Sequence, residues 1–149
     1  MPHSFVRSYL RVFSTKGRLA LIGPELQPRL WAYIGGIARE NGMKAIAIGG
    51  IENHVHVLLS LPATMSFAKA VQLIKGGSSK WVHEEFPGLK DFGWQDGYGA
   101  FSVSRSLIDQ TVEYINHQKE HHQTRSFQEE FIRLLDKHGI GYDARYVFR

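Results

Sequence analysis

The sequence predicts one α+β domain over residues 1–149, with an antiparallel sheet and helices packed against it. Segments rich in β-branched and aromatic residues alternate along the chain with segments in which apolar residues recur every three or four positions. Two strand-like segments are separated by only two residues, a spacing typical of a hairpin and therefore of antiparallel pairing. A chain of 149 residues, 43% of them hydrophobic, is long enough for one core and leaves little room for a second domain.

The first half of the chain predicts three strands and one helix. Residues 8–15 are rich in β-branched and aromatic types and predict a strand, which ends at the Lys-Gly-Arg of residues 16–18. Apolar residues spaced three and four apart then predict a helix over about 30–42. Residues 44–51 and 54–61 predict two strands that form a hairpin, with a two-residue turn between them.

The second half predicts a helix, a strand and two more helices. Ser66 is a suitable N-cap for a helix that continues to residue 82. The Gly-Gly-Ser-Ser of residues 76–79 is expected to weaken or bend this helix, since each mid-helix glycine costs about 1 kcal/mol. Residues 98–104 predict a fourth strand. Capping residues then predict one helix over about 106–122 and another that begins with a capping box at residue 126 and ends at residue 139.

The order of these elements is β-α-β-β-α-β followed by two additional C-terminal helices. The first six elements have the split βαβ order of a ferredoxin-like antiparallel sheet. Because both helices of such a unit pack on one face, the other face of the sheet is expected to be open to a ligand or a partner.

Composition and charge narrow the function classes. The absence of cysteine excludes a disulfide framework, a thiolate zinc site and a cysteine nucleophile. No apolar segment approaches the roughly 20 residues that span a bilayer, and the first residues lack the pattern of a signal peptide, so we expect a cytoplasmic protein without membrane contact. The net charge of +4 is uneven, since residues 1–83 hold ten Lys and Arg against three acids and residues 84–149 carry the excess of acids. A positive first half favours a polyanionic partner, of which nucleic acid is the usual one.

Two histidines at alternate positions of the predicted third strand are candidate metal ligands. Side chains alternate along a strand, so His54 and His56 share one face, while the apolar side chains from Val55 to Leu61 line the other. Two imidazoles at this spacing can present nitrogen atoms to one divalent metal ion. The same spacing also fits histidines that face solvent or form ordinary hydrogen bonds.

The predicted helix over 106–122 brings a tyrosine and a glutamine to one side. With roughly 100° per residue, Gln118 lies about 40° from Tyr114, and both are well separated from the apolar Ile108 and Ile115. We therefore expect Tyr114 on the polar stripe, facing a site to which Gln118 could give an oxygen ligand. An ordinary surface helix with a half-buried tyrosine fits the same spacing.

Together these patterns resemble a known family. The pair His54-Val55-His56 at the end of a hairpin, followed by a helix with Tyr114 and Gln118 four residues apart, strongly resembles the single-tyrosine HUH transposases of the smallest bacterial insertion sequences. The resemblance covers nearly the whole chain and includes stretches within residues 13–18, 94–102 and 114–131. Where many relatives have an acid before the first histidine, this chain has Asn53.

The resemblance implies a reaction and the residues that carry it. Members of the family cut single-stranded DNA by attack of the tyrosine on a phosphodiester, which leaves a 5′-phosphotyrosine and a 3′-OH. Tyr114 would be the nucleophile, and His54, His56 and Gln118 would hold a divalent metal ion, Mg2+ or Mn2+. Family members recognise single-stranded DNA with hairpin ends and act as homodimers with composite active sites, in which the tyrosine of one protomer completes the histidine site of the other.

Basic side chains of the first half are candidate contacts to the DNA backbone. They are Arg7, Arg11, Lys16, Arg18, Lys69, Lys75 and Lys80. Trp94, Tyr98 and Phe101 could stack on bases, although burial is the more frequent outcome for such aromatic residues.

Three other functions fit parts of the sequence. An RNA-binding module of the same element order predicts aromatic residues on its central strands, where this chain has histidines. A histidine-triad hydrolase needs a third histidine at the position of Leu58, and a two-histidine phosphoesterase needs a pair of His-x-Thr/Ser motifs that the chain lacks. A domesticated or non-catalytic relative that only binds DNA or RNA hairpins is the third, but the chain keeps every residue of the catalytic pattern, which favours an active transposase.

Overall fold

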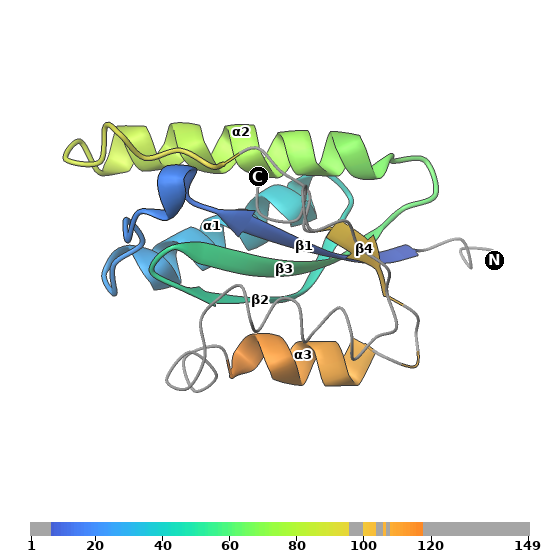
Figure 1. The fold of residues 1–149 in the computed structure, drawn as a ribbon. Coiled ribbons are helices and arrows are strands. Elements are labelled where there is room, and N and C mark those ends of the chain that lie inside the picture. The colour runs from blue at the N-terminus through green and yellow to red at the C-terminus, as the bar shows by residue number, and fades with distance from the viewer. Residues whose placement is uncertain (1–6, 96–99, 104–105, 107, 118–149) are drawn as a thin grey trace.

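A computed structural model describes residues 7–95, 100–103, 106 and 108–117 (Figure 1). In chain order the elements are β1 (Arg7–Ser14), η2 (Lys16–Arg18, a 3-10 turn), α1 (Leu26–Glu40), β2 (Lys44–Ile51), β3 (His54–Leu61), α2 (Phe67–Glu85), β4 (Ala100–Ser102) and α3 (Ile108–Asn116). The helix predicted over 126–139 lies outside the described residues. Within the described part of the chain, no helix has the length and apolar character needed to cross a bilayer.

The four strands form one antiparallel sheet in the order β2-β3-β1-β4, as a ferredoxin-like fold requires. β2 and β3 form the predicted hairpin, with Ile51 opposite His54 and Gly49 opposite His56. β3 lies between β2 and β1, and all of its side chains except Ser60 are buried. The predicted fold class is therefore confirmed, and the histidines lie on an inner strand.

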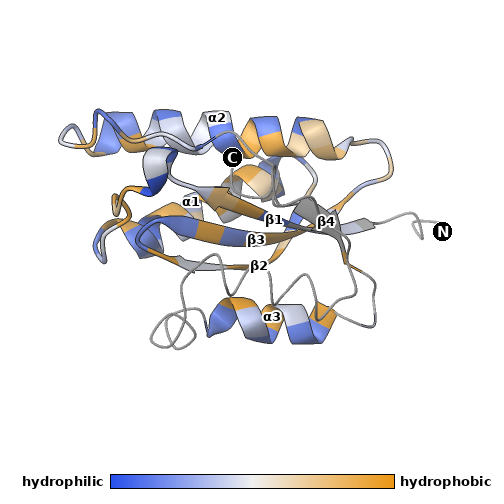
Figure 2. Cartoon of the chain, viewed as in Figure 1, coloured by the Kyte–Doolittle hydropathy of each residue, from blue (hydrophilic) through white to orange (hydrophobic). Residues whose placement is uncertain are grey.

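Helices cover both faces of this sheet (Figure 1). α1 and α2 pack on one face over the main core, which includes Val55, Val57 and Leu59 of β3. α3 packs on the opposite face, where Leu58 of β3 and Ile115 form a smaller core, and its apolar residues lie toward the sheet (Figure 2). The expectation of an open second face is thus wrong for the part that α3 covers.

α2 runs unbroken through residues 76–79, so the Gly-Gly-Ser-Ser does not end the helix. Its N-terminus is capped as predicted, since the Ser66 hydroxyl accepts a hydrogen bond from the backbone N–H of Lys69 at 3.1 Å. Gly77 faces α1, and a Cβ there would lie 2.9 Å from Cδ1 of Ile37. The glycine thus permits close packing of the two helices, and this packing offsets its low helix propensity.

A buried hydrogen bond joins α2 to the segment that follows it. The hydroxyl of Ser78 donates to the carbonyl of Ile74 (2.5 Å) and accepts from the indole Nε1–H of Trp94 (2.9 Å). Trp94 in turn forms an isolated antiparallel bridge with Thr15 and packs on Phe13 and Phe92. Trp94 is therefore a core residue and does not offer its ring to a base.

Candidate active site

The two histidines lie on the face of β3 that α3 covers. Both side chains are fully buried, and their ring centroids are 5.0 Å apart with the ring planes at 82°. The alternation predicted from the sequence is confirmed, because Val55 and Val57 belong to the core under α1 and α2. The strand therefore holds two imidazoles side by side in a dry environment, where electrostatic interactions are stronger than in water.

Asn53, in the turn before β3, orients the first histidine. Its side-chain Oδ1 lies 2.9 Å from Nδ1 of His54, an arrangement in which Nδ1 carries the proton and donates it to the amide oxygen. Nε2 then keeps the lone pair that a metal ligand needs. The backbone carbonyl of Asn53 accepts from the N–H (2.9 Å) and the hydroxyl (3.3 Å) of Thr15. Sequence reasoning missed Thr15, because only the register of β1 against β3 places it at this turn.

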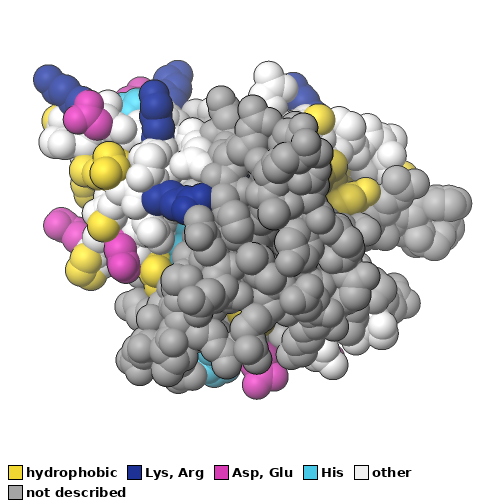
Figure 3. Space-filling model, in the orientation of Figure 1, with side chains coloured by type: hydrophobic (Ala, Val, Ile, Leu, Met, Phe, Trp, Pro, Cys, Tyr) yellow, Lys and Arg dark blue, Asp and Glu magenta, His cyan; other side chains and the backbone are white. Residues whose placement is uncertain are grey.

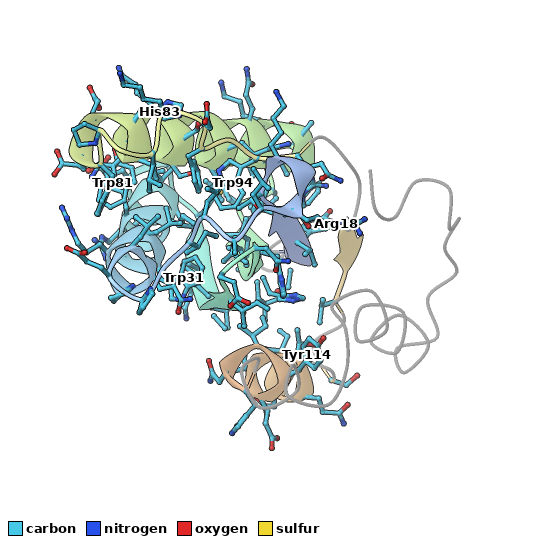
Figure 4. The ribbon with its side chains drawn as sticks, turned by 60° about the vertical axis from the view of Figure 1, so that its left-hand side comes forward. Arg18, Trp31, Trp81, His83, Trp94 and Tyr114 are labelled. Carbon is cyan, nitrogen blue, oxygen red and sulfur yellow. The ribbon has the colours of Figure 1, made fainter. Side chains whose placement is uncertain are left out.

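α3 carries Tyr114 to the second histidine. The tyrosine lies on the side of the helix that faces the sheet (Figure 4), with its ring centroid 5.6 Å from that of His56 and the ring planes at 86°. Its hydroxyl is buried, although the side chain as a whole is half-buried. Thr111 and Ile115 form the buried side of α3. Tyr114 lies at the edge of that side, where it faces His56.

The donor set fits a divalent metal ion. Two imidazole nitrogens are suitable ligands for Mn2+ and related ions, and the two rings lie close enough to serve one centre. Gln118, the third predicted ligand, lies outside the described residues. Among the residues that the structure describes, no group of three or more His, Cys, Asp or Glu side chains could hold a metal ion. Within the described part of the chain, the two imidazoles are therefore the candidate ligands that the structure brings together.

The basic side chains that were predicted to contact DNA differ in their exposure to solvent. Lys16, Lys69 and Lys80 are exposed, Arg18 and Lys75 are half-buried, and the side chain of Arg7 lies outside the described residues. Most of these cations are thus placed where a phosphate could reach them.

Arg11 is the exception, since only 6% of it is exposed. It lies opposite Val57 in the ladder, and its guanidinium carbon is 5.2 Å from the centroid of the Phe13 ring. Burial lowers the pKa of Arg11 to about 10, which still leaves the side chain charged at pH 7. The alternation that turns Val57 toward the helices turns Arg11 there too, away from the surface where a DNA contact was predicted.

Two of the predicted cations meet at a groove of about 550 Å³ formed by η2, α2 and the segment after α2. Lys16, Lys75 and Lys90 line it, with Asp91 as the single acid among its lining residues. The backbone N–H of Lys16 donates to the carbonyl of Gly93 (2.8 Å), and Nζ of Lys75 donates to the carbonyl of Gln95 (3.1 Å). Figure 3 shows Lys and Arg side chains (dark blue) over α2 and η2, with acidic side chains (magenta) near them. Sequence reasoning missed Lys90, which only the folding of this segment brings to Lys16.

The chain is similar in sequence and fold to known proteins. The family model described as "Transposase IS200 like" matches residues 4–118, which include both histidines and the tyrosine. The ISDra2 transposase TnpA of Deinococcus radiodurans is 28% identical over 115 residues, which cover 74% of this chain and 82% of that protein. A crystal structure from the same bacterium, assigned as a transposase, is 26% identical with a TM-score of 0.62 and covers 74% of this chain and 89% of its own.

A more distant structure shares the fold. It is a REP-associated tyrosine transposase bound to a REP hairpin, 18% identical with a TM-score of 0.58, and the match covers 74% of this chain and 65% of that one. The family model spans most of the sequence, and the residues that it matches include those that the structure brings together on β3 and α3. The chain therefore belongs to the IS200-like family of transposases, the enzymes of DNA transposition.

Proposed function

We propose that this chain cuts and rejoins single-stranded DNA at the ends of an insertion sequence, with Tyr114 as the nucleophile and a divalent metal ion at His54 and His56. The observation that carries the proposal is the ring contact between His56 and Tyr114, 5.6 Å between centroids, beside a second imidazole 5.0 Å from the first. A phosphodiester bound against His56 would lie next to the Tyr114 hydroxyl. The resemblance is to transposases of bacterial insertion sequences, and bacterial DNA lies in the cytoplasm, so we place the activity there.

In the proposed reaction the Tyr114 oxygen attacks the scissile phosphorus. The bond between phosphorus and the 3′ oxygen breaks, the phenolic proton leaves to solvent, and the 3′ oxygen takes up a proton from water. The products are a 5′-phosphotyrosine and a 3′-OH. The tyrosine ester conserves the bond energy, so a second 3′-OH can displace Tyr114 and rejoin the strands without ATP.

The residues around Tyr114 provide the conditions for this attack. A phenol has a pKa of about 10 and is mostly protonated at pH 7, so the phosphate itself must be made electrophilic. A bound Mg2+ or Mn2+ supplies this activation as a Lewis acid. His54 and His56 would hold the ion, Gln118 is the proposed third ligand, and Asn53 keeps His54 in the tautomer that binds metal.

We further propose that each chain holds its own site, because Tyr114 contacts His56 of the same chain. Two element ends require two sites, so a homodimer stays part of the proposal, but without exchange of the tyrosine helix. Mixing His56→Ala protein with Tyr114→Phe protein tests this assembly. We expect no cleavage by the mixture, and restored cleavage would show that the tyrosine acts on the histidines of the partner.

The groove lined by Lys16, Lys75 and Lys90 is the proposed contact for the DNA backbone. It lies beside α2, and α2 covers the face of the sheet opposite the histidines. A hairpin substrate is supported by the REP-associated relative, which shares the fold and was solved with a hairpin. In this proposal the stem of the hairpin binds at the groove, and the single-stranded DNA beside the stem extends to the active site.

The decisive experiment is incubation with labelled single-stranded DNA that carries hairpins, with Mn2+ or with EDTA, followed by a denaturing gel. We expect a covalent protein–DNA adduct with Mn2+, none with EDTA, and none from Tyr114→Phe. Tyr33→Phe is the matched control, because Tyr33 is exposed on α1, and it should form the adduct at the normal rate. Hydrolysis without an adduct would contradict the proposal, and hairpin binding without cleavage would favour the non-catalytic alternative.

A further inference from the structure

We infer that Gly49 of β2 is a positioning residue for Tyr114, because its lack of a side chain lets α3 dock close enough to bring the phenol to His56. The functional part of this inference rests on the proposed role of Tyr114. Its structural part concerns only how α3 meets the sheet.

The packing of α3 on Gly49 leaves no room for a side chain. A Cβ at Gly49 would lie 2.6 Å from the carbonyl oxygen of Ile115 and 2.9 Å from its Cγ2, both shorter than real Cβ contacts. The flexible end of a side chain can rotate away from such a contact. The Ile115 carbonyl belongs to the backbone of α3, so the helix itself must move.

The position of this contact connects it to the proposed reaction. Gly49 is directly opposite His56 in the β2–β3 ladder, and Ile115 directly follows Tyr114 in α3. The residues that set how closely α3 docks are therefore immediate neighbours of the two rings that lie 5.6 Å apart. Any displacement of α3 at Gly49 carries Tyr114 with it.

Backbone strain does not explain the glycine. Among the described glycines, only Gly17 and Gly42 have positive φ, so the backbone at Gly49 suits any L-residue. Alanine at this position is compatible with the strand, and its effect should come from the helix packed above it.

The expected effect follows from the distance. Raising a 2.6 Å approach to an ordinary contact of 3.4 Å requires a displacement of 0.8 Å, the difference between the two values. A misplacement of about 1 Å can lower the rate of a positioned reaction roughly 100-fold. We therefore expect Gly49→Ala to lower kcat about 10- to 100-fold, and the larger Gly49→Val to lower it further.

The experiment measures adduct formation at saturating hairpin DNA and saturating Mn2+, with KM for DNA and the folded fraction by circular dichroism. Gly49→Ala should lower kcat and leave KM and the Mn2+ requirement near wild type. Gly36→Ala is the matched control, since a Cβ at Gly36 in α1 meets nothing within 4 Å, and its kcat should not change. A normal kcat for Gly49→Ala, or a loss accounted for by KM or unfolding, would overturn the inference.

A second measurement separates this inference from the proposed function. The nuclear Overhauser effect between the ring protons of Tyr114 and His56 should be visible in the wild-type protein and weaker in Gly49→Ala. An equally strong effect in the variant would overturn the inference, whatever the activity. Wild-type protein that forms no adduct but shows the expected weakening would instead contradict the proposed function alone.

Discussion

Replacing Asn53 with alanine removes the side-chain oxygen that lies 2.9 Å from Nδ1 of His54 and changes little else. The backbone carbonyl of Asn53 keeps its hydrogen bonds from Thr15. Among the described non-glycine residues only Arg18 has a positive φ, so alanine suits the backbone at residue 53. The variant therefore isolates the contribution of one hydrogen bond to the orientation of a proposed metal ligand.

Two estimates limit the size of the effect. A neutral hydrogen bond contributes about 0.5–1.5 kcal/mol, which corresponds to a factor of about 2 to 13 in an equilibrium constant. Loss of a hydrogen-bond partner of a metal-bound histidine typically lowers metal affinity by about 10- to 100-fold. The two ranges meet near a factor of about ten, or about 1.4 kcal/mol, and this is the weakening of Mn2+ binding that we expect for Asn53→Ala.

The assay is the Mn2+ concentration that gives half-maximal adduct formation at saturating DNA. Asn53→Asp should need no more Mn2+ than wild type, because a carboxylate accepts the same hydrogen bond more strongly. Asn41→Ala is the matched control, since the side-chain amide of Asn41 donates to the carbonyl of Ile37 at the end of α1. An Asn53→Ala protein with the wild-type Mn2+ requirement would refute the orienting role.

Two further predictions concern stability and DNA binding. Ser78→Ala should lower the free energy of unfolding in urea by about 0.5–2.5 kcal/mol. The buried indole N–H of Trp94 loses its acceptor at a cost of about 1–3 kcal/mol, and alanine returns about 0.5 kcal/mol of helix propensity. Trp94→Phe should lower the free energy of unfolding by less in the Ser78→Ala protein than in the wild-type protein. Strictly additive effects of the two substitutions would contradict the hydrogen bond between Trp94 and Ser78. Lys16→Gln and Lys75→Gln should each reduce the slope of log affinity for single-stranded DNA against log salt by about 0.7, whereas Arg39→Gln on α1 should not. An unchanged salt dependence of the affinity in both lysine variants would show that the DNA does not bind at the groove.

The parts of the site that depend on local sequence were predictable. Strand alternation placed His54 and His56 on one face and Val55 on the other, because that rule needs only the strand itself. The two-residue turn fixed the hairpin, and with it the pairing that makes β3 an inner strand once β1 is added.

The parts of the site and of the fold that depend on packing between distant segments could not be predicted from the sequence. The place of Tyr114 is set by the docking of α3 at Gly49, which no periodicity in either segment encodes. Gly77 lowers helix propensity, but its contact with Ile37 of α1 keeps the helix intact. Arg11 is one of several basic residues in the sequence. The alternation of side chains along β1 places it on the face of the sheet that α1 and α2 cover, where it is buried.

Peptide mapping of the adduct by mass spectrometry tests most directly whether Tyr114 is the residue that becomes joined to DNA. Wild-type protein would be incubated with hairpin DNA and Mn2+, treated with nuclease and protease, and analysed for a peptide that carries nucleotide mass. We expect a 5′-linked nucleotide on the peptide with Tyr114 and on no other. Nucleotide on a different residue, or a linkage through the 3′ phosphate, would contradict this expectation.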